Sequence, residues 1–309
     1  MASAAGHYIG VWEEIADARA PAFKISGKCA IISRDLIPEI ETSPLFALPA
    51  ITAYLCATLC FTLRLFRGDQ FRIPLRPVGL LLGFVGILLH GLLIYRNIVT
   101  HSGINLGVFN AFSLIAWTIL LLLLTSSLRK PVENLGIVLM PMAALAIFLE
   151  SRYVSVHLIL TESTPVGLTI HIIVSILAYS LFTLASVQAV LLAIQDHYLR
   201  KRHPGGFIRA LPPLQTMESL LFEMIAAGFV LLTLALVSGF TFLEDMFAQH
   251  LVHKTVLSIA SWIVFGTLLW GRYRFGWRGQ KALIWTLSGF VVLMLAYFGS
   301  KVVIELILK

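Results

Sequence analysis

The sequence is poor in charged residues and in cysteine. Only 13% of its 309 residues are charged and 58% are hydrophobic, whereas about 25% of the residues of a typical soluble domain are charged. So few charges cannot cover so much apolar surface in water, which argues against a soluble globular protein. The cysteines do not indicate a redox or metal site, because Cys56 and Cys60 fall inside an apolar run. They are expected to act there as small packing residues.

Motifs of known enzyme classes are also missing. The sequence has no phosphate loop, no dinucleotide-binding glycine pattern, no nucleophile elbow and no HExxH or CxxCH motif. Glu223 is the one carboxylate that falls clearly inside an apolar run, and a proton-driven transporter usually carries more intramembrane charge. The net charge of +7 comes from short clusters between apolar runs, so nucleic-acid binding is not expected. We expect no chemical step, and therefore no enzyme.

Long apolar runs are what the sequence has in abundance. A membrane-spanning helix needs about 20 mostly apolar residues. The fifth run is longer than the hydrocarbon requires, and Pro141 interrupts the fourth. We predict an all-α polytopic integral membrane helix bundle with about eight transmembrane helices, near 45–63, 77–95, 106–125, 133–149, 167–194, 219–243, 255–271 and 282–306.

Lys and Arg are distributed unequally between the connections, which predicts the orientation. The connections after the second, fourth and sixth runs hold few basic residues (Arg96, Arg152 and Lys254) and carry the acids Glu150, Glu162, Glu244 and Asp245. Basic loops stay in the cytoplasm, so both termini are expected to be extracytoplasmic. The connections after the first, third, fifth and seventh runs hold Arg64, Arg67, Arg72, Arg76, Arg129, Lys130, Arg200, Lys201, Arg202, Arg209, Arg272, Arg274, Arg278 and Lys281.

Residues 1–43 differ from the membrane domain expected over 44–309. They contain no apolar run and no signal-peptide pattern. A short, disordered or amphipathic tail and an overlong gene prediction are the two interpretations, and no function is assigned there. Aromatic residues near the ends of the runs are mostly expected in an interfacial belt; they are Tyr54, Tyr95, Trp270, Tyr273, Trp277, Trp285 and Tyr297.

Histidine is the residue type with the clearest functional potential. His90 falls late in the second run and His171 one turn into the fifth, so both are expected at a similar depth near the outer face. An imidazole in hydrocarbon is costly unless it faces a partner, a cavity or a ligand. Two neutral imidazoles from facing helices suit axial ligation of haem iron. His250 and His253, three residues apart on one helix face, are supplementary candidates.

A packing role is the alternative for these histidines. A membrane histidine often only hydrogen-bonds a carbonyl or hydroxyl of a neighbouring helix. Candidate partners are Ser113, Ser175 and Tyr179.

Five stretches together resemble the CcsA/CcmC family of cytochrome c assembly proteins, over roughly residues 44–305. Within the family, the short YpjD-type inner-membrane proteins are the most similar. The stretches are Leu89-His90 with Arg96 and Asn110-Ala111-Phe112; Pro165-Val166-Gly167-Leu168 with His171; Leu211-Pro212-Pro213-Leu214 with Glu218; Gly276-Trp277-Arg278-Gly279; and Gly289-Phe290 with Tyr297-Phe298-Gly299.

The resemblance implies a bacterial inner-membrane protein that handles haem at the outer face. His171 matches a family haem ligand and His90 a recurrent histidine of the second span, while Arg96 and Arg152 would pair with haem propionates. The expected partners are the lipid bilayer, haem and other cytochrome c assembly or membrane proteins.

Two departures from the family pattern support a second hypothesis. The family's tryptophan-rich outer segment is replaced by residues 251–257, Leu-Val-His-Lys-Thr-Val-Leu, and no histidine follows Gly299. The alternative is a membrane accessory subunit or small transporter on the same scaffold that has lost haem handling. In that case His90 would be a packed polar residue, and Glu218 and Glu223 would be candidates for a partner or ion site.

Overall fold

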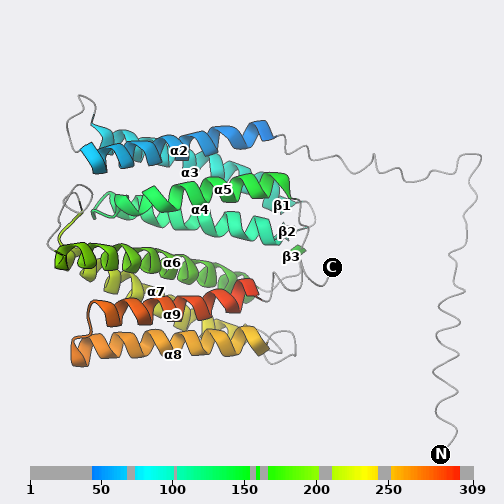
Figure 1. Ribbon diagram of the computed structural model, residues 1–309. Helices are drawn as coiled ribbons and strands as arrows, with labels where there is room; N and C mark the ends of the chain where they lie inside the picture. Colours follow the sequence, from blue (N-terminus) through cyan, green and yellow to red (C-terminus); the bar gives the residue numbers. More distant parts are fainter. Residues whose placement is uncertain are drawn as a thin grey trace, which may run out of the picture. The chain divides into compact units, whose positions relative to one another are not determined.

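The computed structural model is an all-helical bundle with one small sheet at one end. It describes residues 44–67, 74–100, 103–153, 158–160, 166–201, 211–242 and 252–299. The eight long helices run along a common direction (Figure 1). They are α2 (Pro44–Arg67), α3 (Leu75–Ile98), α4 (Val108–Ser127), α5 (Gly136–Arg152), α6 (Val166–Arg200), α7 (Leu214–Phe242), α8 (Val252–Phe275) and α9 (Gln280–Met294).

Within the described ranges, eight helical segments are long and apolar enough to cross a membrane, which confirms the predicted fold class. α6 has 35 residues, so the expected overlength of the fifth span is confirmed. α5 continues through Pro141 and is preceded by the 3-10 turn η2 (Glu133–Leu135). A proline in a membrane helix is tolerated where neighbouring groups satisfy the freed carbonyl. The tail of residues 1–43 lies outside the described residues.

The helices form two four-helix units that meet mainly through α4 and α6. The first unit is α2–α5, in which α2 packs on α3 and α5; the second is α6–α9, in which α6 packs on α7 and α9. Glycine allows the close approach of α2 and α3, since a Cβ on Gly86 would lie 2.5 Å from Cε1 of Tyr54.

A three-stranded antiparallel sheet covers one end of the first unit. Its strands are β1 (Val99–Thr100), β2 (Gly103–Asn105) and β3 (Leu158–Leu160), in the order β1-β2-β3. The start of α2 and the end of α9 lie at this same end (Figure 1). We call it the sheet end and the opposite one the charged end. The π-helical turn η4 (Leu295–Gly299) follows α9.

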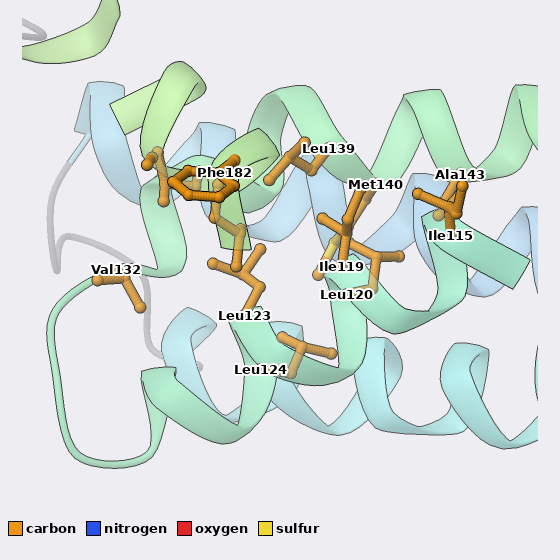
Figure 2. Close-up of a cluster of buried hydrophobic side chains, with 14 of the residues drawn as sticks. Ile115, Ile119, Leu120, Leu123, Leu124, Val132, Leu139, Met140, Ala143 and Phe182 are labelled. Atoms are coloured by element: carbon orange, nitrogen blue, oxygen red, sulfur yellow. The ribbon is translucent and has the colours of Figure 1, made fainter. Parts of the chain in front are cut away.

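One apolar core runs through both units. Ile119, Leu120 and Leu123 of α4 pack with Met140 of α5, and Phe182 of α6 reaches the same cluster (Figure 2). The Phe182 ring also stacks on Phe265 of α8, with 3.8 Å between ring centroids. Towards the charged end, an apolar groove of about 310 Å³ remains between the units, lined mainly by residues of α5, α6 and α9 such as Val138, Val190 and Leu287.

Buried ion pairs hold the charged end together. Glu133 accepts hydrogen bonds from Arg64 and Arg76, at 2.8 and 3.0 Å, and joins α2 and α3 to η2. Glu218 of α7 does the same for the second unit, because it accepts from Arg272 and Arg278. Both carboxylates are buried, and each is balanced by two arginines.

Candidate functional site

His171 lies in the second turn of α6, near the sheet end, and its imidazole points towards α7. Nδ1 lies 2.9 Å from the carbonyl oxygen of Ala235 and 3.1 Å from Oγ of Ser238. A carbonyl oxygen can only accept, so Nδ1 carries the hydrogen and Nε2 keeps its lone pair. Within the part of the chain that the structure describes, no hydrogen bond engages Nε2, and the side chain is half-buried.

This arrangement suits a metal-ligating histidine. Ligating imidazoles usually donate their second N–H to a carbonyl or carboxylate, which fixes the tautomer and the ring orientation. Ala235 fills that role here, and Ser238 is itself anchored by donating to the same carbonyl at 3.0 Å. His171 could therefore bind a metal ion through Nε2. Among the described residues, no group of three or more His, Cys, Asp or Glu side chains could hold a metal ion.

His90 is in a different environment, inside the first unit. Its side chain is fully buried, with Nε2 2.8 Å from Oγ of Ser113 and Nδ1 3.2 Å from the hydroxyl of Tyr54. Ser113 donates onward to Oε2 of Glu150, and Asn97 donates to Oε1 of Glu150 at 3.0 Å. We call Tyr54, His90, Asn97, Ser113 and Glu150 the polar chain; it links α2, α3, α4 and α5.

The structure does not bring His90 and His171 to a shared site, contrary to our expectation. His90 is enclosed between α2 and α4, and both its nitrogens are hydrogen-bonded. His171 faces α7, while the adjacent Ile172 packs towards Ile94 and Ile98 of the first unit. A fully buried imidazole with two occupied nitrogens has the geometry of a packed polar residue, which is the alternative role, and Ser113 is one of the partners expected for it.

Glu218 and Glu223, the candidates for a partner or ion site, are both engaged in ion pairs. Glu218 is the buried acceptor of Arg272 and Arg278. Glu223 is an exposed carboxylate that accepts from Lys130. These pairs connect neighbouring segments of the bundle, so the structure offers structural roles for both residues.

The supplementary candidates are only partly described. His253 lies in the first turn of α8, but nothing can be said of its side chain, and His250 lies outside the described residues. Arg96 and Arg152 are exposed and lie near the sheet end of α3 and α5. Their role as propionate partners stays a prediction.

Three members of the polar chain were not anticipated as site residues. Glu150 was expected in an outer loop, but α5 extends to Arg152 and buries its carboxyl. Tyr54 was expected in the interfacial belt and is fully buried, whereas Tyr95, Trp270 and Tyr273 are exposed as a belt requires. Asn97 lies two turns after His90 in α3, and that spacing was the signal that could have placed both on one helix face.

The comparison with known families settles the relationship of the chain. The model of the family described as "Cytochrome C assembly protein" matches residues 78–308. The chain belongs to this family. The match spans seven of the eight long helices, from α3 to α9, and therefore includes both His90 and His171.

Individual relatives of this assembly-family protein agree with that assignment. It is 32% identical over 274 residues to the "Inner membrane protein YpjD" of Escherichia coli (strain K12), covering 85% of this chain and 99% of that protein. It is 30% identical over 87 residues to the "Cytochrome c biogenesis protein CcsA" of Microcystis aeruginosa, covering 28% of this chain and 26% of that protein. No solved structure matches.

Proposed function

We propose that this protein binds haem through His171 at the sheet end of the bundle and presents it to other cytochrome c assembly proteins. The observation that carries the proposal is the contact of His171 Nδ1 with the Ala235 carbonyl, 2.9 Å long, which leaves Nε2 to a ligand. Haem, when bound, supplies an iron centre for delivery, and the protein contributes ligation and orientation without a chemical step of its own.

A group of aromatic side chains in the second unit also supports this proposal. Farther along α6, the ring of Tyr179 contacts Phe290 and Tyr297, with centroids 5.8 and 6.0 Å apart. Aromatic side chains offer the flat apolar surface on which a porphyrin packs. We further propose that the sheet end faces the extracytoplasmic side of a bacterial inner membrane, because the basic residues gather at the other end.

The visible spectrum of the protein tests the haem proposal. The full chain is purified in detergent, loaded with haem and recorded oxidised and reduced. We expect a Soret band that His171→Ala removes. His197→Ala is the matched control, because His197 is exposed near the opposite end of the same helix; it should leave the band unchanged. A loaded wild-type protein without a Soret band would contradict the proposal.

A membrane accessory subunit remains the second candidate function. The packing of His90 between Tyr54 and Ser113 favours it, because one of the two expected haem ligands is already occupied. A protein that stays colourless after haem loading would support this candidate.

A further inference from the structure

Among the residues that the structure describes, the first unit contains a buried carboxyl group without a counter-ion. Three glutamate side chains are buried in the described part of the chain: Glu133, Glu150 and Glu218. Glu133 and Glu218 each accept hydrogen bonds from two arginines. Glu150 accepts only from the neutral side chains of Ser113 and Asn97. An ionisable group of this kind inside a membrane domain indicates function.

The hydrogen bonds of the polar chain have one consistent direction. Ser113 donates to Glu150, so its oxygen accepts from Nε2 of His90, and Nδ1 of His90 then accepts from the hydroxyl of Tyr54. Every donor in this series has an acceptor, and the series ends on an ionised Glu150. This pattern of hydrogen bonds fits the deprotonated state of the carboxyl group.

The same side chains can also satisfy a protonated Glu150. A new O–H bond on Oε2 would donate to Oγ of Ser113, which has two lone pairs and can still accept from His90. The Ser113 hydrogen would then turn to the carbonyl of Phe109, one turn earlier in α4. Ser and Thr residues make this bond to the residue four positions earlier elsewhere in the bundle, for example Ser127 to Leu123 at 2.8 Å and Ser180 to Ile176 at 2.8 Å.

No charged side chain interferes with this exchange among the described residues. Asn97 of α3 and Ser113 of α4 face the carboxyl group, followed by His90 and then Tyr54 of α2. Arg96 and Arg152, the basic residues nearest in sequence to Asn97 and Glu150, have exposed side chains. At its inner end the polar chain stops at Tyr54, which lies in the same apolar core as Phe61. The described part of the polar chain therefore does not cross the unit.

We propose that Glu150 is a reversible proton-binding site, with the Ser113 hydroxyl as the switch that stabilises both protonation states. One proton from water at the sheet end forms one O–H bond on Glu150, and no other covalent bond changes. This site is independent of haem, because it lies in the first unit whereas His171 lies in the second.

Infrared difference spectroscopy of the full-length protein tests the site. Spectra of the purified protein are recorded over a pH series in H2O and in D2O, in the region where protonated carboxyl groups absorb. We expect a narrow carboxylic-acid band to appear as the pH falls and to be absent in Glu150→Gln. The control Glu223→Gln, which removes an exposed carboxyl, should keep the band.

Ser113→Ala provides a second measurement should Glu150→Gln not fold. Removing the hydroxyl takes away the acceptor of the protonated acid and a donor of the carboxylate, so the band should change frequency. Wild-type spectra without the narrow band at any pH, or with a constant band at every pH, would overturn the proposal. A band that neither Glu150→Gln nor Ser113→Ala alters would overturn it as well.

Discussion

Nδ1 of His171 and the carbonyl oxygen of Ala235 lie 2.9 Å apart and join α6 to α7 near the sheet end. The contact fixes the hydrogen on Nδ1 and directs the Nε2 lone pair away from this partner. An imidazole held in this way needs little reorganisation to bind a metal ion.

Ser238→Ala should weaken haem binding much less than His171→Ala does. Ser238 is only a second acceptor for Nδ1, at 3.1 Å, and the Ala235 carbonyl remains in the variant. Loss of an outer partner of a metal-ligating histidine typically costs about 10- to 100-fold in affinity, so we expect the lower end of that range or less. Haem titration followed at the Soret band measures it, with Ser219→Ala at the exposed start of α7 as the control. Equal losses in Ser238→Ala and His171→Ala would contradict the assignment.

Tyr54→Phe should destabilise the first unit by about 1 kcal/mol. The substitution keeps the ring that packs against Gly86 but removes the hydroxyl that is hydrogen-bonded to Nδ1 of His90. Denaturation in mixed micelles gives the free energy of unfolding. Tyr95→Phe is the matched control, because Tyr95 is 65% exposed and its change should stay within about 0.5 kcal/mol. Identical stabilities for the two variants would argue against the hydrogen bond.

Glu133→Ala should destabilise the protein by about 2 kcal/mol. Removing one member of a buried ion pair costs about 3–5 kcal/mol, but Arg64 and Arg76 are 32% and 42% exposed and keep contact with water. Glu223→Ala breaks an exposed pair with Lys130, and such pairs contribute about 0–1 kcal/mol. The same unfolding measurement compares the two variants, and a larger loss in Glu223→Ala would contradict the role of Glu133.

Cysteine labelling should find the charged end in the cytoplasm. Basic residues such as Arg129 and Arg274 lie at this end, and cytoplasmic loops carry the excess of Lys and Arg. Single cysteines introduced near residues 70 and 205, in a background without Cys29, Cys56 and Cys60, should react with impermeant reagents only after the membrane is opened. A cysteine at Tyr153, near the sheet end, should react in intact cells. The opposite pattern would reverse the orientation.

The sequence predicted the helices better than the contacts between them. Eight apolar runs of sufficient length translate directly into spans, because the bilayer fixes the required length. The predicted end of α5 was wrong by three residues. Because of this error, Glu150 was predicted in a loop, whereas it occupies a buried position in the helix. The environment of Tyr54 depends on Gly86 of a neighbouring helix, which spacing within one helix cannot reveal.

The two histidines show the same limit. His90 and His171 were placed in the correct helices at a comparable depth, but depth alone does not say which way a side chain points. The orientation of α3 about its own axis directs His90 into the first unit. The orientation of α6 about its axis directs His171 towards α7. Such orientations follow from packing along the whole length of both helices, which a single sequence does not show.

The groove between Val138, Val190 and Leu287 has a mechanical consequence for the bundle. It removes part of the contact between the two units towards the charged end, while Phe182 keeps them joined in the common core. A rocking motion of one unit against the other would therefore pivot about this part of the common core and open or narrow the groove. His171 lies eleven residues from Phe182 along α6, on the side opposite to Val190, so the same motion would also move the sheet end. Lipid that enters the groove would therefore displace the surroundings of His171 as well.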